Sequence, residues 1–299
     1  VLLVNFLKKW VNEENPYMWL MPTILLLGGF YLWPIIDVIR ISFTNAHLYK
    51  RTYNFTFDTI VQAFSTSGFF ETLWVTFIYV LASVVGQLIL GLILAVILRR
   101  ATDRRLPGTT LIKIAILIPW MMPGVSAGIS WNYLLSEASV GFFNNALQSF
   151  GYEPVRFLSD KTNALISVCA ANIWKGTAFS MIVFYAAVST LPSNLYAASA
   201  VDGAKPWQQL IFITLPQMKT IITIVLILIT IGTLNSLEII LALTGGGPGR
   251  STEVMSLFIL NTVFVRGNIA LGSVFAVILM LICLALTFAY MRLIELDKE

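Results

Sequence analysis

The sequence predicts an all-α, polytopic membrane protein with six transmembrane helices. Of its 299 residues, 58% are hydrophobic and 11% are charged, whereas about a quarter of the residues of an ordinary soluble domain are charged. The mean hydropathy is +0.83, and several apolar runs reach the roughly 20 residues that a helix needs to cross a bilayer core. A soluble globular domain is therefore excluded, and the lipid bilayer is the first expected partner.

Charge and the rare residue types exclude several other functions. The net charge is +4, but the basic residues are scattered over the loops and form no stripe, so nucleic acid is not an expected partner. Cys169 and Cys283 lie in apolar runs, where cysteine acts as a small packing residue. With one histidine, His47, the sequence offers no metal-ligand cluster. We predict no metal site, no catalytic residue and no cofactor in this chain.

The first 16 residues are expected to form an amphipathic helix on a membrane face, because apolar residues recur at helical spacing beside Lys8 and Lys9. A packed part of the helix bundle is the alternative. The transmembrane domain is assigned to residues 17–299, and its first span covers about 17–43. Asp37 and Arg40 lie three residues apart near the end of this span, which favours a local ion pair.

The second span, about 73–98, ends in the arginine cluster RRATDRR. Short loops rich in arginine stay on the cytoplasmic side, so this loop is placed in the cytoplasm. The third span, about 109–135, contains Pro119 and Pro123, which remove helix hydrogen bonds and predict kinks beside a cavity. Residues 44–68, between the first two spans, are polar and aromatic and are expected to form an interfacial elbow.

Alternation of sides then orders the rest of the chain. Residues 136–160 are placed outside, with a short surface helix because Val140, Phe143 and Leu147 recur about one turn apart. The remaining spans are predicted at about 163–190, 220–243 and 269–293, and the segment that follows the fifth span is again outside. Both termini are expected in the cytoplasm.

Residues 191–216 are expected to form a cytoplasmic hairpin of two short helices, broken at Asp202 and Gly203. Glycine permits a sharp turn, and the Asp202 side chain can cap the second helix. Small residues dominate the first half, and bulky apolar residues such as Trp207 dominate the second. A surface for docking another protein and a plain interfacial loop both fit this pattern.

The spacing of the hairpin residues resembles the cytoplasmic "EAA" signature of permease subunits in binding-protein-dependent ABC importers. Ala198 and Ser199 are followed by Gly203 and by Ile213-Thr214-Leu215-Pro216, while Ala197 stands where the motif has Glu. In that family the hairpin is the coupling helix that sits in a cleft of an ATPase subunit. The resemblance implies that the ATPase-coupling residues are Ala197, Ala198, Asp202, Gly203, Ala204, Leu215 and Pro216.

Further segments resemble the carbohydrate-uptake branch of the family, in particular the type of the larger maltose permease subunit. They are ILIPWMMPGVSAGISWNYLL, VGFFNNALQSFGYEPVRFLSD, NIWKGTAFSMI and LALTGGGPGRSTEVM. The resemblance implies the type I ABC importer permease fold in a bacterial inner membrane. The implied partners are a second permease subunit in a heterodimer, two ABC ATPase subunits that carry ATP and Mg, and an extracytoplasmic substrate-binding protein.

A row of polar residues in the fourth and fifth spans predicts a substrate-binding site. Members of the row share a helix face at spacings of three, four and seven residues, and polar groups at membrane depth are functional candidates. Amides and hydroxyls suit the hydroxyls of a sugar, and an aromatic ring suits its apolar face. The alternative is packing between helices, with Lys175 and Glu238 neutralising each other. The predicted residues are Asn172, Lys175, Gly176, Phe179, Thr233, Asn235, Ser236 and Glu238.

The segment TGGGPGRST is close to a phosphate-binding loop but does not match it. Arg250 occupies the position of the required lysine, and Thr244 that of the first glycine. We therefore expect a tight turn after the fifth span, and the resemblance adds a contact with the binding protein.

The predicted function is that of a transport subunit without enzymatic activity, which moves a sugar or oligosaccharide across the cytoplasmic membrane. Lys175 would suit an acidic sugar such as a uronate oligomer, although neutral-sugar permeases carry a similar Trp-Lys pair. A phosphate ester or a polyamine remains open as substrate. A secondary transporter is the main alternative, but such proteins tend to repeat their broken helices in both halves, and this sequence shows no second copy. A membrane scaffold would not need the polar row.

Overall fold

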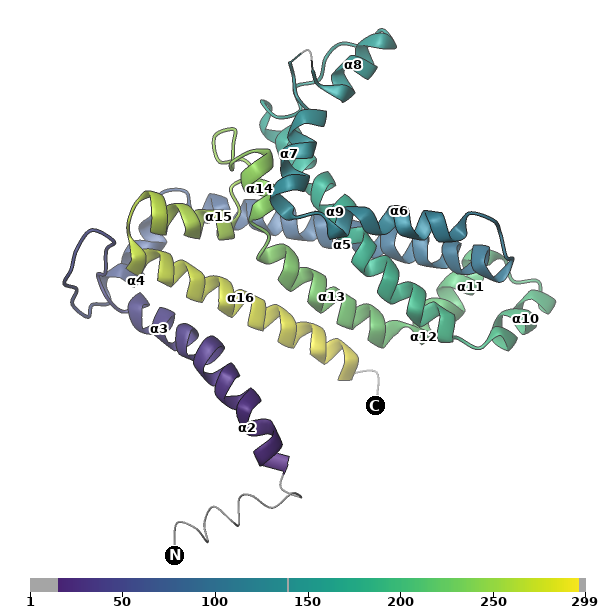
Figure 1. Cartoon of the computed structure of the whole chain (residues 1–299), viewed down its shortest axis with the longest axis horizontal. Helices are drawn as coiled ribbons and strands as arrows, with labels where there is room; N and C mark the ends of the chain where they lie inside the picture. The colour runs from purple at the N-terminus through teal and green to yellow at the C-terminus, as the bar shows by residue number, and fades with distance from the viewer. Residues whose placement is uncertain (1–15, 139, 296–299) are drawn as a thin grey trace, which may run out of the picture. The chain divides into compact units, whose positions relative to one another are not determined.

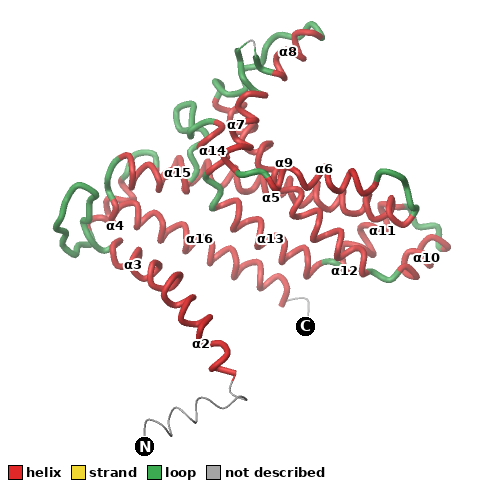
Figure 2. The backbone as a smooth tube through the Cα atoms, in the orientation of Figure 1, coloured by secondary structure: helices red, strands yellow, loops and turns green. Residues whose placement is uncertain are grey.

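The computed structural model describes residues 16–138 and 140–295. This part of the chain consists of helices joined by loops and turns, with no strand in it (Figure 2). The predicted all-α class is confirmed. The amphipathic helix expected for residues 1–16 lies outside the described residues, apart from Pro16.

The chain divides into two compact units, residues 1–66 with 261–278 and residues 67–260 with 279–299. In the first unit, α2 (Pro16–Leu27), a π-helical segment (Gly28–Leu32) and α3 (Trp33–Ser42) follow one another. The apolar stretch Trp19–Ser42 is long enough to cross a membrane, in agreement with the first predicted span. Arg40 Nη2 and Asp37 Oδ1 form the expected ion pair at 2.8 Å.

The loop after α3 contains a helix that the sequence analysis missed, α4 (Asp58–Ser65). A single antiparallel bridge joins Thr44 to Phe55. The chain returns to this unit in a π-helical segment (Asn261–Val265) and the start of α16 (Ile269–Glu295). The backbone amides of Leu48 and Ala270 donate to the carbonyls of Gly267 and Ala46, which ties the returning chain to the loop.

The second unit is organised around α5 (Phe69–Asp103) and α9 (Lys161–Thr190), the second and fourth predicted spans, which lie against each other (Figure 1). Small residues allow their close approach. A Cβ atom on Gly91 would lie 2.5 Å from Ser180 Cβ, so only glycine lets the two backbones come this near. Asp160 begins α9 as its cap, accepting from the backbone amides of Thr162 and Asn163.

The third predicted span is two helices rather than one kinked helix. α6 (Thr109–Met121) and α7 (Gly124–Leu134) are bent by 102°. Pro123 lies in extended backbone at the bend, where its missing N–H breaks no helix bond. α7 leads to α8 (Phe142–Ser149), which confirms the short surface helix expected after the third span.

The fifth predicted span is also divided, and its single-helix prediction is wrong. α13 (Lys219–Leu234) ends at Asn235, and a separate short helix, α14 (Glu238–Leu243), follows. The segment after α14 is not all loop either, because α15 (Met255–Leu260) begins there. Loss of helix at residues 235–237 exposes backbone groups, which a membrane protein tolerates where they line a cavity.

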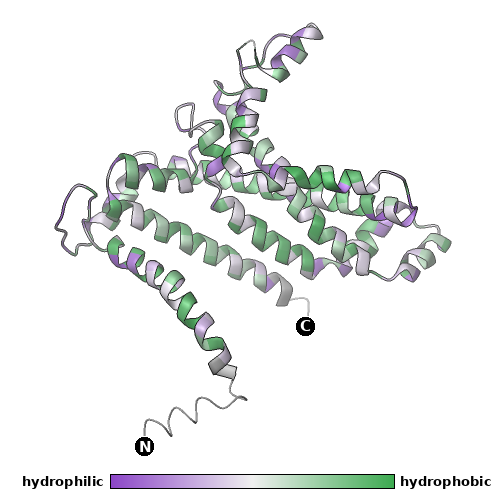
Figure 3. Cartoon of the chain, in the orientation of Figure 1, coloured by the Kyte–Doolittle hydropathy of each residue, from purple (hydrophilic) through white to green (hydrophobic). Residues whose placement is uncertain are grey.

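Among the described residues, four helices are long and apolar enough to cross a membrane, and the count reaches six if each of two bent pairs forms one span. The four are the Trp19–Ser42 run, α5, α9 and α16. The bent pairs are α6 with α7, and the helical run Pro206–Gln217 with α13. Figure 3 shows that the longest helices carry mostly hydrophobic residues.

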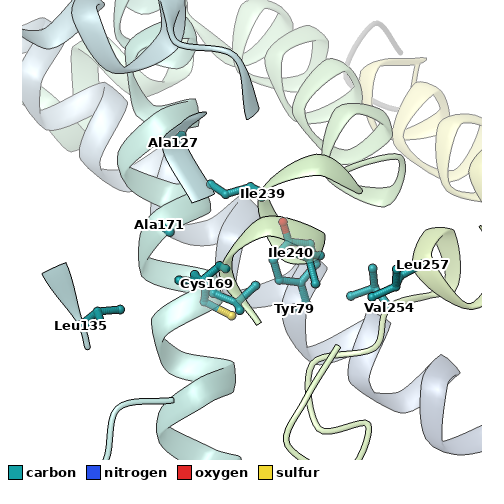
Figure 4. Packing of buried hydrophobic residues seen from close by; sticks show 11 residues of the cluster. Tyr79, Ala127, Leu135, Cys169, Ala171, Ile239, Ile240, Val254 and Leu257 are labelled. Carbon is teal, nitrogen blue, oxygen red and sulfur yellow. The ribbon is translucent and has the colours of Figure 1, made fainter. Parts of the chain in front are cut away.

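A buried cluster in the second unit joins α5, α7, α9 and α14 (Figure 4). Tyr79 of α5 and Ile240 of α14 are completely buried in it, as are the smaller Ala127 of α7 and Ala171 of α9. Cys169 also belongs to this cluster and is a free thiol, as predicted. The cluster positions the α13–α14 break beside α5 and α9.

Candidate functional site: a polar cavity and a helical hairpin

A cavity of about 640 Å³ lies in the second unit, where α5, α6, α7, α9, α13 and α14 meet. All eight predicted substrate-binding residues line it. The predicted lining residues are Asn172, Lys175, Gly176, Phe179, Thr233, Asn235, Ser236 and Glu238, and the structure adds Gln87, Trp120, Gly124, Leu228, Ile229, Gly232, Leu237 and Ile239.

The α9 wall of the cavity follows from helical spacing. Asn172, Lys175, Gly176 and Phe179 lie within two turns of an unbroken 30-residue helix, so one face carries all four. The second wall does not form as expected, because Asn235 and Ser236 lie in the break between α13 and α14 instead of on a helix face.

The break is held in place by hydrogen bonds from two other elements. Tyr79 Oη of α5 donates to Ser236 Oγ at 3.2 Å, and Ser256 Oγ of α15 donates to the Ser236 carbonyl at 3.0 Å. Asn235 Nδ2 donates to the Ile231 carbonyl at 2.8 Å. The bond from Ser256 gives a partner to the Ser236 carbonyl, a backbone group within the interruption.

Two glycines provide room for polar side chains on the cavity wall. A Cβ on Gly176 would lie 2.9 Å from Gln87 Nε2 and would overlap the rest of that amide. A Cβ on Gly124 would lie 2.8 Å from Glu238 Cβ. The predicted Gly176 is therefore a packing partner of Gln87, a glutamine in an apolar run that could have been found from its depth in the second span.

The charged groups of the cavity are not paired with each other. Among the described residues, no ion pair involves Lys175 or Glu238. Lys175 is half-buried and Glu238 is exposed. Asn172 Nδ2 is buried without a hydrogen-bond partner, and an unmet donor costs free energy that a bound acceptor could recover. The mutual neutralisation considered for Lys175 and Glu238 is not observed.

An aromatic pair completes the cavity. The rings of Trp120 and Phe179 have centroids 6.2 Å apart and are tilted by 32°. Trp120 lies in α6 directly after Pro119, and sequence analysis did not include it. Ammonium, carboxylate, amide and aromatic groups together can bind a polar solute through its hydroxyls and its apolar face.

The hairpin of residues 191–216 has the expected break but a different cap. α10 (Ser193–Val201) ends at Asp202, and Gly203 adopts a φ of 78° that suits glycine. The second helical run begins with α11 (Pro206–Gln209) and continues through a π-helical segment (Leu210–Thr214) and α12 (Leu215–Gln217). The prediction that Asp202 caps this run is wrong, because Lys205 occupies that position and its N–H donates to Gln208 Oε1 at 2.7 Å.

The first helix of the hairpin presents its small residues to the outside. Ala197, Ala198, Asp202 and Gly203 are exposed, and Val201 is 88% exposed. On the second half, Pro216 is exposed, whereas Ala204 and Leu215 are half-buried. Val201, at the end of α10, is apolar and almost fully exposed, so its side chain is available for contact with another protein surface.

The glycine-rich segment forms the tight turn that was predicted. Thr252 Oγ1 donates to the Gly247 carbonyl at 2.8 Å, and the Thr252 amide donates to the Gly246 carbonyl at 3.2 Å. Sequence analysis missed the role of Arg250. Its Nη1 donates to the Ser67 carbonyl at 3.0 Å, and its Nε lies 3.2 Å from Glu253 Oε2. The side chain thus fixes the turn to the beginning of α5.

The described residues contain no group of histidine, cysteine or acidic side chains arranged to hold a metal ion.

The family of inner membrane components of binding-protein-dependent transport systems matches residues 60–297. The chain belongs to this family. The resemblance seen in the hairpin and in the other segments is thereby confirmed.

Relatives within the family are permease subunits of about the same length. The chain is 30% identical over 285 residues to the trehalose/maltose transport system permease protein MalF of Thermococcus litoralis, covering 95% of each chain. It is 29% identical over 278 residues to the sulfoquinovosyl glycerol transport system permease protein SmoG of Agrobacterium fabrum, covering 92% of this chain and 89% of that one.

The fold also matches a solved transporter of the family type. In a crystal structure of a bacterial alginate ABC transporter with its alginate-bound periplasmic protein, one chain aligns with a TM-score of 0.79 and 23% identity. The alignment covers 92% of this chain and 91% of that chain. The predicted ABC importer permease fold is therefore confirmed.

Proposed function

We propose that this chain is the permease subunit of an ATP-driven importer that takes a sugar or oligosaccharide from an extracytoplasmic binding protein. The observation that carries the proposal is the cavity of about 640 Å³ with its amide, ammonium, carboxylate and aromatic groups. Such groups are costly in a membrane-spanning unit unless they face a polar solute or water. The names of the MalF and SmoG relatives, which refer to trehalose/maltose and sulfoquinovosyl glycerol, support a carbohydrate.

The charged residues of the cavity support an acidic sugar as one candidate substrate. Lys175 has no carboxylate partner among the described residues, so it can bind the acidic group of a uronate oligomer. Glu238 can accept hydrogen bonds from sugar hydroxyls. One solved neighbour belongs to a transporter that imports the acidic polysaccharide alginate. A phosphate ester is a further candidate, because another relative is an sn-glycerol-3-phosphate permease.

The hairpin supplies the proposed docking surface for an ATPase subunit. The beginning of its second helix lies beside the arginine-rich end of α5, since Arg100 Nη2 donates to the Pro206 carbonyl at 3.4 Å. Two segments that we assign to the cytoplasm thus occupy the same end of the unit. Both termini belong to the cytoplasmic side in this arrangement, and a second permease subunit forms a heterodimer with this chain. ATP and Mg bind to two separate ATPase subunits.

In this mechanism the chain performs no bond chemistry. Closure of the ATPase subunits moves the hairpins and opens the cavity toward the binding protein, and hydrolysis returns it to the cytoplasm. The cavity and the hairpin are two sites whose ligands bias the same conformational equilibrium.

Uptake by the reconstituted importer tests the proposal. Lys175→Ala should lower substrate-stimulated ATP hydrolysis and uptake by about tenfold, for loss of a charged hydrogen bond. Phe179→Ala should lower both because it removes the aromatic surface for the apolar face of the sugar. Lys175→Ala should affect an acidic oligosaccharide more than a neutral one. Ile166→Ala is a matched control, because Ile166 lies on α9 but lines no part of this cavity. Wild-type kinetics in both cavity variants would contradict the assignment.

The docking surface is tested separately. Replacement of the exposed Ala198 by Trp should prevent the ATPase subunits from co-purifying with this chain while leaving membrane insertion intact. Leu111→Trp provides the control, since Leu111 is 72% exposed on α6 and lies outside the hairpin. Unchanged binding of the ATPase subunits by Ala198→Trp would contradict a docking role.

A further inference from the structure

A cavity of about 180 Å³ separates the base of the hairpin from the ends of α5 and α9. On one side, α5 contributes three charged residues, and α5 and α9 each contribute a valine. On the other side, the hairpin contributes mostly polar residues. The lining residues are Val96, Arg99, Arg100, Asp103, Val188, Leu191, Ser193, Tyr196, Gln209 and Thr214. The hairpin is therefore not packed directly against the helix ends there.

The hairpin is braced within itself. Tyr196 Oη and Thr214 Oγ1 are 3.0 Å apart, and Gln209 Nε2 donates to Ser199 Oγ at 3.0 Å. Both bonds join the first helix to the second half. In contrast, α10 has no buried residue. The two halves of the hairpin are thus held together by hydrogen bonds, although its first helix has little packing against the rest of the unit.

Two arginines bridge the gap from α5. Arg100 Nη2 donates to the Pro206 carbonyl in the hairpin, and Arg99 Nη1 donates to the Ser189 carbonyl in the last turn of α9, each at 3.4 Å. Arg99 Nε also pairs with Asp103 Oδ2 at 2.9 Å. In the part of the chain that the structure describes, no other side-chain hydrogen bond joins α5 to residues 193–217.

We propose that Arg100 is a positioning residue that transmits displacement of the hairpin to α5. This inference rests on the proposed docking of an ATPase subunit at the hairpin. α5 is a single helix from Phe69 to Asp103, and it carries Gln87 on the wall of the polar cavity. Gln87 lies about 20 Å from Arg100 along the helix, at about 1.5 Å per residue. A rigid helix of this length moves the cavity wall when its end is pulled.

The hairpin is joined through the chain itself only to α9 and α13, which precede and follow it. The Arg100 bond adds a direct link to α5, which otherwise follows the hairpin only through its packing against α9 and α13. Without this bond, binding of the ATPase subunits remains possible, but their closure moves α5 less. Arg100 thus contributes to the coupling free energy between hairpin and cavity, which is typically worth five-fold or more in such systems.

The test compares Arg100→Met, Arg100→Lys and Arg104→Met in the complete reconstituted importer. Methionine replaces the aliphatic stem of arginine but cannot donate a hydrogen bond, whereas lysine keeps the positive charge and a hydrogen-bond donor. Arg104 lies in the same arginine cluster and is exposed, and its side chain makes no hydrogen bond or ion pair with another described residue. Arg104→Met therefore removes an equal charge from the same cluster and serves as the control.

The expected result is a separation of binding from coupling. With Arg100→Met, the ATPase subunits should co-purify as with the wild type, and basal hydrolysis should persist. Substrate-stimulated hydrolysis and uptake should both fall about five-fold, with partial recovery in Arg100→Lys and no change in Arg104→Met. A thermal unfolding temperature equal to that of Arg104→Met excludes a folding defect.

Two results would overturn the inference. Arg100→Met could match Arg104→Met in stimulated hydrolysis and uptake, or it could lose the ATPase subunits, which would make Arg100 part of the docking surface. Failure of the proposed function looks different. In that case the wild-type chain itself would retain no ATPase subunits, and the inference would fall with it.

Discussion

Tyr79 and Ser236 are hydrogen-bonded side chain to side chain, with Tyr79 Oη donating to Ser236 Oγ at 3.2 Å. The bond joins the first half of α5 to the break between α13 and α14. Tyr79 is completely buried, so the bond is shielded from competing water. The interrupted fifth span thus depends on a residue of the second span for its geometry.

Tyr79→Phe should lower the free energy of unfolding by about 1 kcal/mol, the usual net contribution of one hydrogen bond. Uptake should fall further than this loss of stability explains, because the break carries Ser236 and Asn235 on the cavity wall. Denaturation in detergent and uptake by proteoliposomes measure the two effects. Tyr133→Phe is the control, since Tyr133 is 66% exposed; equal behaviour of both variants would contradict a special role for Tyr79.

Gly68→Ala should destabilise the chain at the start of α5. Gly68 has a φ of +85°, and a Cβ there would overlap Arg250 Nη1 and lie 2.7 Å from Arg250 Cζ. The left-handed conformation alone costs an alanine about 1–2 kcal/mol. Gly151→Ala is the matched control, because Gly151 has a φ of +82° with nothing within 4 Å of its Cβ position.

The difference in unfolding temperature between Gly68→Ala and Gly151→Ala therefore measures the cost of displacing the Arg250 side chain. Gly68→Ala should be the less stable of the two. If both lose the same stability, the contact between Gly68 and Arg250 contributes nothing and the glycine is required only for its backbone conformation.

Gly176→Ala should alter the cavity with little change in stability. The new Cβ would meet the amide of Gln87, which is the end of a flexible side chain and can move at low cost. Displacement of that amide should change the apparent affinity for substrate by about three- to tenfold, the range of one neutral hydrogen bond. Gly232→Ala controls for the added methyl, because Gly232 lines the same cavity with nothing within 4 Å.

The dependence of the uptake rate on substrate concentration gives the KM of Gly176→Ala and of Gly232→Ala. An unchanged KM for Gly176→Ala, together with a wild-type unfolding temperature, would show that Gln87 takes no part in binding.

Glu137 should make the segment 136–160 sensitive to acid. The hydrogen bond from the Ser159 hydroxyl, at 2.6 Å, is the main reason that the pKa of Glu137 lies below its ordinary value. The amides of Leu158 and Ser159 also donate to its carboxylate, at 3.0 and 2.9 Å. These bonds favour the charged form, so their stabilisation is complete above the ordinary pKa of a glutamate.

As the pH falls from about 4.5 through the lower pKa of the folded state, this stabilisation should be lost. Limited proteolysis of the segment between pH 7 and pH 3 should show faster cleavage at the acidic end. In Glu137→Gln the segment should be cleaved faster already at pH 7 and should depend less on pH. An equal pH dependence in the wild type and in this variant would contradict the prediction.

Sequence patterns predicted those parts of the fold that depend on long apolar runs and on helical spacing. α5, α9 and α16 lie within a few residues of the predicted spans. The α9 face of the cavity followed directly from the spacing of Asn172, Lys175, Gly176 and Phe179. Periodicity works here because an unbroken helix keeps a fixed angle between successive residues.

The same reasoning failed where the backbone leaves the helix. The sequence analysis assigned residues 220–243 to one span, although Gly232, Asn235 and Ser236 are of types that favour a helix end or a loop. Bonds from Tyr79 and Ser256, which are distant in sequence, hold this break. Lys205 likewise replaces Asp202 at the start of the second hairpin helix, since Pro206 sets the backbone there.

Ser236 differs from Asn172, Lys175 and Glu238 in one respect that bears on how the substrate of this transporter could change. Ser236 is committed to Tyr79 and Ser256, whereas the donor of Asn172 is unmet and the two charged residues take part in no described ion pair. Replacing any of these three side chains would break no internal bond of that kind. Specificity could thus drift at these three positions while the architecture stays intact, which would let one scaffold serve many nutrients.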